Sequence, residues 1–139
     1  MKYLLILALL GFIQPIHAQV LNIEISNIKS DKGVIVLSLY NEAKGFPYQG
    51  TSATKHFTVK PISGKVSYSI KDISSGIYAI ALFHDLNLDQ KLSTNALGIP
   101  KEDYAFSNNA SNLFGVPGFK DASFLLKKDT TIFIKMKHF

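Results

Sequence analysis

The chain has 139 residues, of which 47% are hydrophobic and 18% charged, so it is long enough for one folded domain and lacks the composition of a disordered chain. The formal net charge is +5, and because every basic residue is Lys and none forms a basic stripe, we expect no nucleic-acid partner. There is no Cys, which excludes disulfide frameworks, Cys-based zinc sites, iron–sulfur clusters and thiol catalysis.

The N-terminus is organised like a secretory signal peptide. A positively charged start is followed by an apolar run over residues 3–13, then by Pro15 and by a small residue, Ala18, at a cleavage position. The run has 11 residues, whereas a membrane span takes roughly 20. We therefore expect a signal peptide over residues 1–18 and a periplasmic or secreted mature chain, folded as one domain over residues 19–139, with no membrane span left after cleavage.

The mature chain is predicted to consist of strands, because apolar and polar residues alternate with a period of two. The predicted strands cover residues 19–28, 33–40, 56–60, 65–70, 77–83, 119–126 and 130–137. The first two flank a turn signal and are expected to form a hairpin, as are the last two. The strand over residues 77–83 is almost wholly apolar, which is typical of a central strand covered on both faces.

This pattern predicts an all-β fold, an antiparallel β-sandwich of about seven strands and of immunoglobulin-like or prealbumin-like type, with one long ordered loop. A small barrel is the alternative. Before the central strand, Gly76 is expected to adopt a positive φ and Tyr78 to return its hydroxyl to the turn backbone, as tyrosine corners do in sandwiches.

The long segment over residues 84–118 opens with a polar cluster directly after the central strand. Asp85, Asn87 and Asp89 are two residues apart, and in a tight loop this spacing turns three oxygen side chains towards one point, as calcium loops require. The sixth and twelfth positions are not the Gly and Glu of an EF-hand, so a calcium site would need a further ligand. The candidates are Glu102, Asp103, Asn95 and Asp121, of which we favour Glu102. The alternative is that these side chains form Asx turns that cap backbone groups.

Two other groups in this segment are candidates for chemistry or binding. His84 follows the central strand and could act as an acid or base with a loop carboxylate such as Glu102, although it should point away from its neighbour Asp85. A ligand groove would have Tyr104, Phe106 and Phe119 as walls and Asn108 and Asn109 as polar hooks. The alternative is that these aromatic residues plug the sandwich and the Asn side chains bond to loop backbone. We also expect the other large apolar residues of the segment to be buried, namely Leu92, Leu97, Ile99 and Phe114.

From Gly76 to Asn109 the sequence GIYAIALFHDLNLDQKLSTNALGIPKEDYAFSNN resembles the bacterial family called domain of unknown function 2141, and GVPGFKDA, over residues 115–122, looks like its second signature. The resemblance implies an exported, prealbumin-like β-sandwich and supplies no activity. Gln90, Ser93 and Ala105 replace the Gly, Asp and Gly of the family pattern, and the first two changes weaken the cation loop.

The sequence thus predicts an exported binding or accessory module for an unidentified envelope or extracellular ligand, expected to be a monomer. Calcium, held by Asp85, Asn87, Asp89 and Glu102, is the cofactor that the sequence favours. The alternatives are a small hydrolase that uses His84 with a loop carboxylate and a purely structural envelope protein.

Overall fold

A computed structural model of the chain describes residues 18–138, so the predicted signal peptide lies outside the described residues except for Ala18. The strands are β1 (Gln19–Ile28), β2 (Val34–Tyr40), β3 (Lys55–Val59), β4 (Gly64–Ile73), β5 (Gly76–Asp85), β6 (Tyr104–Phe106), β7 (Phe124–Leu126) and β8 (Thr130–Lys135). Short helical turns are η1 (Gly50–Ser52), η2 (Ser107–Asn109) and α1 (Phe119–Ala122). The prediction of an all-β sandwich is confirmed.

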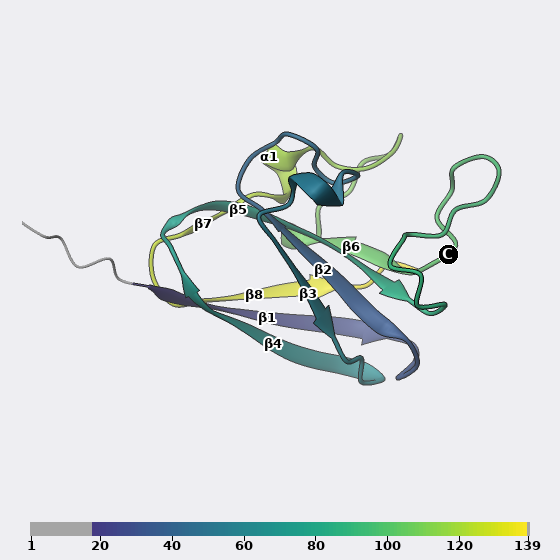
Figure 1. The fold of residues 1–139 in the computed structure, drawn as a ribbon, viewed down its shortest axis with the longest axis horizontal. Helices are drawn as coiled ribbons and strands as arrows, with labels where there is room; N and C mark the ends of the chain where they lie inside the picture. Colours follow the sequence, from purple (N-terminus) through teal and green to yellow (C-terminus); the bar gives the residue numbers. More distant parts are fainter. Residues whose placement is uncertain (1–17, 139) are drawn as a thin grey trace, which may run out of the picture.

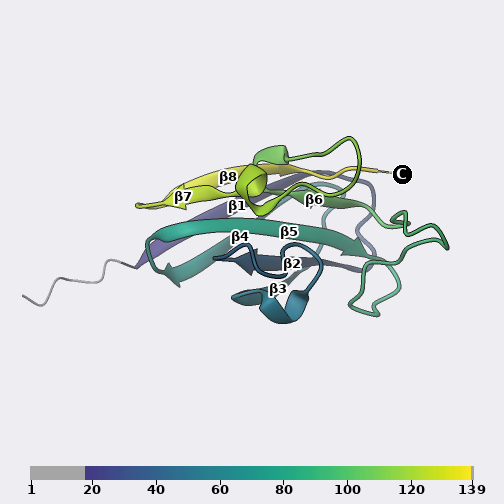
Figure 2. The ribbon, with the colours of Figure 1, turned by 90° about the horizontal axis from the view of Figure 1, so that it is seen from above.

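The strands form two sheets that face each other (Figures 1 and 2). The first sheet has the order β4-β1-β8, and the second has the order β3-β2-β5-β6, with β7 also paired to β5. All pairs are antiparallel except β1 with β8, which run parallel. The wholly antiparallel sandwich that the sequence predicts is therefore wrong in this one pair.

Both predicted hairpins are also wrong. β1 and β2 follow each other in sequence but belong to different sheets, and β7 pairs with β5 while β8 pairs with β1. A turn signal fixes only a reversal of chain direction, and the reversal serves equally well for a connection that crosses between sheets. The choice of partner depends on which apolar faces meet in the core, which is a long-range property.

The core lies between the sheets and is lined by the apolar residues of the predicted alternation. Leu21, Ile23 and Ile25 of β1 are completely buried, and they face Ile35 and Leu37 of β2 in one apolar cluster. The central strand β5 is covered on both faces, as predicted, because a second apolar cluster covers its outer face. Ala79 and Ala81 leave room there for aromatic rings.

This outer cluster joins residues of β5, β6 and α1, and Phe46 of the β2–β3 connection packs against it. The ring centroid of Phe46 lies 6.0 Å from that of Phe106 and 5.8 Å from that of Phe119. Phe119 belongs to α1, where the sequence pattern predicts the start of a strand. The helical turn forms because the Gly118 N–H donates to Asp121 Oδ2 and the Asp121 N–H donates back to the Gly118 carbonyl.

The corner before β5 is as predicted in one respect and different in another. The Tyr78 hydroxyl donates to the Ser74 carbonyl at 3.0 Å, which is the expected tyrosine corner. The positive φ, however, belongs to Asp72 at 54° and not to Gly76. Asp tolerates the left-handed region better than most residues. The chain therefore turns at Asp72, two residues before Ser74, which accepts the Tyr78 hydroxyl.

Candidate functional site

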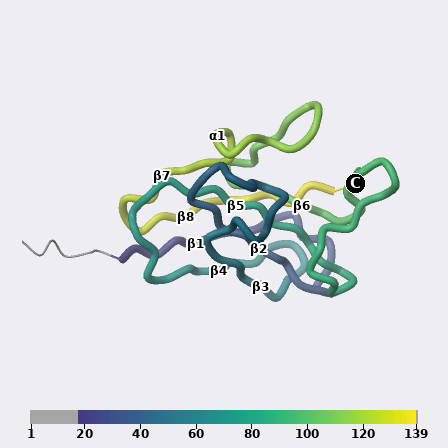
Figure 3. Tube along the Cα trace, turned by 45° about the horizontal axis from the view of Figure 1, so that its top comes forward, coloured from purple at the N-terminus to yellow at the C-terminus, as the bar shows by residue number. Residues whose placement is uncertain are grey.

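Two loops project from the sandwich, one beyond an end of the strands and one beside α1 (Figures 1 and 3). The first runs from the end of β5 to β6, and the second runs from η2 to α1. The side chains that the sequence nominates for a site lie in these loops and in the adjoining β5, β6, η2 and α1.

Asp85 is the buried anchor of the first loop. Its side chain is completely buried at the end of β5, where Oδ2 accepts the Gln90 N–H at 2.8 Å and Oδ1 accepts the Asp89 N–H at 3.3 Å. A buried carboxylate is tolerated when backbone amides satisfy its oxygens. Gln90 reaches this position with a left-handed φ of 60°. Asp85 therefore closes a tight turn at the start of the loop.

Asn87 and Asp89 make the Asx turns that the sequence offers as the alternative to a metal site. Asn87 Oδ1 accepts the Asp89 N–H at 3.3 Å, and Asp89 Oδ1 accepts the Lys91 N–H at 2.8 Å. The Asn87 amide also donates to Asp89 Oδ2 at 3.0 Å. Three candidate ligands thus lie close together, and each already caps a neighbouring backbone amide.

Glu102 ties the two ends of the turn together from the far side of the loop. It is only 6% exposed, and its Oε1 accepts the Leu86 N–H at 3.1 Å while Oε2 accepts the Ser93 N–H at 2.9 Å. Over residues 18–138, no three or more acidic, His or Cys side chains are grouped as metal ligands. Calcium binding by Asp85, Asn87, Asp89 and Glu102 stays a prediction, and both oxygens of Asp85 and of Glu102 already accept backbone N–H groups.

His84 is a buried anchor for the turn between β1 and β2. The side chain is 2% exposed, and Nε2 lies 2.7 Å from the Lys32 carbonyl, so this nitrogen carries the proton and donates. Gly33 follows with a φ of 69°, and a Cβ atom there would lie 2.2 Å from the Asp85 carbonyl oxygen. In the described part of the chain no direct hydrogen bond joins His84 to Glu102, and the alternative of a hydrolase stays a prediction.

Asn108 and Asn109 bond to the protein's own backbone. Both have left-handed φ values, 59° and 50°. The Asn108 amide donates to the Asp121 and Ser123 carbonyls, at 3.2 and 2.7 Å. Asn109 Oδ1 accepts the Lys135 N–H at 2.8 Å, and its amide donates to the Phe133 carbonyl at 3.4 Å. These contacts match the alternative in which the Asn side chains fasten loops.

The two aromatic candidates lie together and pack inward. The ring centroids of Tyr104 and Phe106 are 5.5 Å apart, and Phe106 is only 5% exposed within the outer cluster. Tyr104 is partly buried against the same cluster. Of the five predicted ligand contacts, His84 and Phe106 are therefore buried in the fold, and the two Asn side chains are engaged with backbone.

The apex of the first loop exposes apolar side chains that the sequence analysis expects to be buried. Leu97 is 84% exposed and Ile99 is 47% exposed. Asn95 organises this first tip (residues 95–99), because its Oδ1 accepts the Leu97 and Ile99 N–H groups at 2.9 and 3.0 Å. The expectation of burial is wrong here because the turn closes on its own hydrogen bonds.

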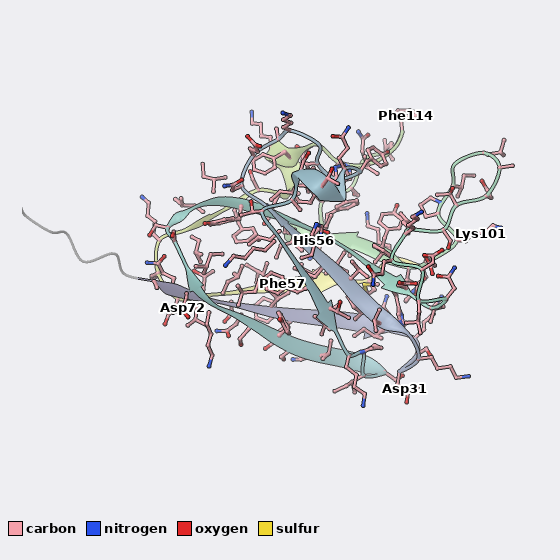
Figure 4. All side chains as sticks on the ribbon, viewed as in Figure 1. Asp31, His56, Phe57, Asp72, Lys101 and Phe114 are labelled. Atoms are coloured by element: carbon pink, nitrogen blue, oxygen red, sulfur yellow. The ribbon has the colours of Figure 1, made fainter. Side chains whose placement is uncertain are left out.

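The second loop ends in a similar tip (residues 112–115) that is still more exposed. Leu113 is 93% and Phe114 is 96% exposed, and Phe114 lies at the far end of the loop (Figure 4). Asn112 Oδ1 accepts the Phe114 N–H at 3.3 Å, and Asn112 forms a bridge with Gly115. The expected burial of Phe114 is wrong for the same reason. An Asn followed by one or two apolar residues and a Gly is the sequence signal for both tips.

The comparisons place the chain in one family. The model of domain of unknown function 2141, described as an uncharacterised protein conserved in bacteria, matches residues 23–133. The match covers β1 to most of β8 and both loops. The comparisons with curated proteins and with solved structures found no match.

Proposed function

The chain belongs to this bacterial family, and we propose that it is an exported binding module that contacts an envelope or extracellular partner through its two tips. The observation that carries the proposal is the near-complete exposure of Leu113 and Phe114 on a turn closed by its own hydrogen bonds. Single exposed apolar residues are common, but two adjacent ones at an apex, with a further tip nearby, are typical of contact surfaces.

The energetics favour binding over a purely structural role. Full burial of one Leu or Phe side chain is worth about 1.5–3 kcal/mol, which each tip forgoes while it faces water. Because the buried carboxylates of Asp85 and Glu102 fix the first loop, little further ordering is needed on contact, and preorganisation of this kind raises affinity. A protein whose loops served only to complete its own core would turn these side chains inward.

A photo-crosslinking experiment tests the proposal without a known ligand. A benzoylphenylalanine is placed at Phe114, at Leu97 or, as the matched control, at Phe133, which is 64% exposed on β8. We expect discrete adducts with envelope or extracellular material from the two tip positions and none from Phe133. Equal labelling at all three positions, or none, contradicts a binding module that works through its tips.

A second candidate function, calcium stabilisation, is favoured by one specific observation. Gln90 occupies the sixth position of the Asp85–Asp89 pattern with a left-handed φ, and its N–H donates to Asp85 Oδ2. The sixth position of a calcium loop is normally Gly because of the sharp turn there. We propose that the loop takes calcium through Asp85, Asn87 and Asp89, and that the ion would fix the base of the first tip.

Thermal unfolding in EDTA, in calcium and in magnesium tests this second candidate. A ligand at a hundredfold excess over its dissociation constant stabilises the folded state by about 2.7 kcal/mol. We expect the midpoint to rise by several degrees in calcium alone, and Asp89→Asn to abolish the rise while keeping the Asx turn. Asp31→Asn, a change in an exposed turn, is the control. An identical midpoint in EDTA and calcium overturns this role for the loop.

A further inference from the structure

We infer that the second tip inserts into the interface of a lipid bilayer that carries anionic headgroups. This inference rests on the proposed function, because it names the partner of one of the two tips. Leu113 and Phe114 are adjacent and more than nine-tenths exposed, and Phe114 lies at the apex of the loop (Figure 4). Apolar and aromatic side chains on such an apex are suited to the boundary between headgroups and acyl chains.

The backbone of the tip is prepared for a medium that offers few hydrogen bonds. A peptide group that enters a lipid environment must have its N–H and carbonyl satisfied within the protein. The Phe114 N–H is accepted by Asn112 Oδ1 at 3.3 Å, and Asn112 and Gly115 form a bridge across the turn. The Phe114 N–H therefore keeps its partner when the tip leaves water.

The loop that carries the tip has no negative charge of its own. No acidic residue occurs from Tyr104 to Lys120, so this loop has no carboxylate that lipid phosphates would repel. The nearest acidic residue after the tip, Asp121, is held at the base of the loop by the Gly118 N–H. Without the predicted signal peptide, which contains one Lys, the chain has 14 Lys and 10 acidic residues, and a formal net charge of +4 attracts it to an anionic leaflet.

Within the described residues no helix is apolar and long enough to span a membrane.

The chain contains no Trp, so a single Trp reports on one position without background. Phe114→Trp keeps an aromatic ring at the apex, and Phe133→Trp places the same reporter on the outer face of β8 as the control. Each variant of the purified protein is mixed with vesicles of phosphatidylglycerol and phosphatidylcholine, or of phosphatidylcholine alone. We expect a blue shift and quenching by brominated lipid for Phe114→Trp with the anionic vesicles, and neither change for Phe133→Trp.

Co-sedimentation with the same vesicles measures how much binding is lost when the tip is made polar. The double change Leu113→Ser with Phe114→Ser should lower the affinity for anionic vesicles about tenfold or more. Each substitution removes most of the free energy that an apolar side chain gains when it leaves water for lipid. The variant should fold, since both residues face water in the free protein. Raising the salt concentration should weaken the wild-type contact.

Three results overturn the inference. They are the absence of a blue shift for Phe114→Trp, an equal shift for Phe133→Trp, and unchanged sedimentation of the double variant. If the vesicle experiments fail while crosslinking from position 114 still captures a protein, the binding module stands and its partner is not lipid. If both experiments fail, the proposed function fails as well.

Discussion

The cost of an unusual backbone conformation is clearest at Gln90. Its φ of 60° lies in the left-handed region, which is unfavourable for a residue with a Cβ atom by roughly 1–2 kcal/mol. Its N–H nevertheless donates to buried Asp85 Oδ2, and this bond holds the turn. The residue is therefore kept in place by its backbone contact and not by its side chain.

We predict that Gln90→Gly stabilises the fold, because Gly accepts this φ without strain. The expected gain is about 0.5–1 kcal/mol after the greater flexibility of Gly in the unfolded chain is subtracted. Urea unfolding measures the change. Gln49→Gly is the matched control, since Gln49 has a φ of −96° and should gain nothing from Gly. A destabilised Gln90→Gly variant would show that the side chain itself matters.

The buried hydroxyl of Tyr40 makes the free energy of unfolding depend on pH. Burial raises the pKa of its hydroxyl above the ordinary value of 10.0, and a hydrogen bond with Ser38 lowers it in part. The neutral form is therefore favoured by folding, and this contribution is complete below pH 10 and lost as the pH rises through the higher folded pKa. The same hydroxyl donates to the Pro47 carbonyl at 3.1 Å.

The free energy of unfolding should therefore fall above pH 10 more steeply for the wild-type chain than for Tyr40→Phe. Urea unfolding across pH 8 to 11 (roughly the range around the Tyr pKa) measures the two slopes. Tyr48→Phe serves as the control, since Tyr48 is 76% exposed and its removal should leave the slope unchanged. Equal slopes for Tyr40→Phe and wild type would contradict the shifted pKa.

Among the elements, β8 illustrates how a loop side chain can replace a missing strand. β8 pairs with β1 on one edge, and on the other edge Asn109 accepts the Lys135 N–H and donates to the Phe133 carbonyl. The side-chain amide thus makes the two hydrogen bonds that the backbone of an adjacent strand would make with β8. It also blocks part of an edge on which a second chain could add.

We predict that Asn109→Asp weakens this edge selectively. Asp keeps the size and the tolerance for positive φ, but it loses the amide that donates to the Phe133 carbonyl and places a carboxylate against that oxygen. The expected loss of stability is about 1–2 kcal/mol. In Asn109→Ala, which also removes the Oδ1 acceptor, hydrogen exchange should show faster exchange of the Lys135 amide with little change at Ile23 in the centre of β1. Unchanged exchange at Lys135 would contradict a structural role for Asn109.

In the whole molecule, the exposure of an apolar residue decides how much it contributes to the stability of the fold. Ile23 is completely buried between the sheets, whereas Ile77 is 55% exposed on β5. The same chemical change should therefore have very different consequences. Stability comes from the interior, and the exposed apolar residues of the tips are free to serve contact with a partner.

Ile23→Ala should destabilise the fold by about 2–5 kcal/mol, since it removes buried methylene groups and leaves a cavity. Ile77→Ala, the matched change at the surface, should stay within about 0.5 kcal/mol of wild type. Thermal or urea unfolding measures both. Comparable losses for the two variants would mean that the outer face of β5 near Ile77 contributes to the core, contrary to its exposure.

Much of the local structure was determined by the sequence by itself. The period of two located the strands other than β6, which lies in the predicted long loop, and it also located the buried faces of β1 and β4. The wholly apolar β5 indicated a strand covered twice. The oxygen side chains at Asp85, Asn87 and Asp89 led to the Asx turns that are observed, and the corner at Tyr78 was recognisable. These features depend on residues within a few positions of one another, so a local reading finds them.

Only the tertiary structure decided which strands pair, which partners the loop side chains use and which apolar residues stay outside. The partners of Asn109 are 24 and 26 residues away along the chain, and β8 lies beside β1 from the opposite end of the domain. Backbone ladders are chemically alike, so the preference among them comes from the fit of whole apolar faces. The exposure of Leu113 and Phe114 follows in the same way, because a turn that satisfies its own hydrogen bonds need not pack against the core.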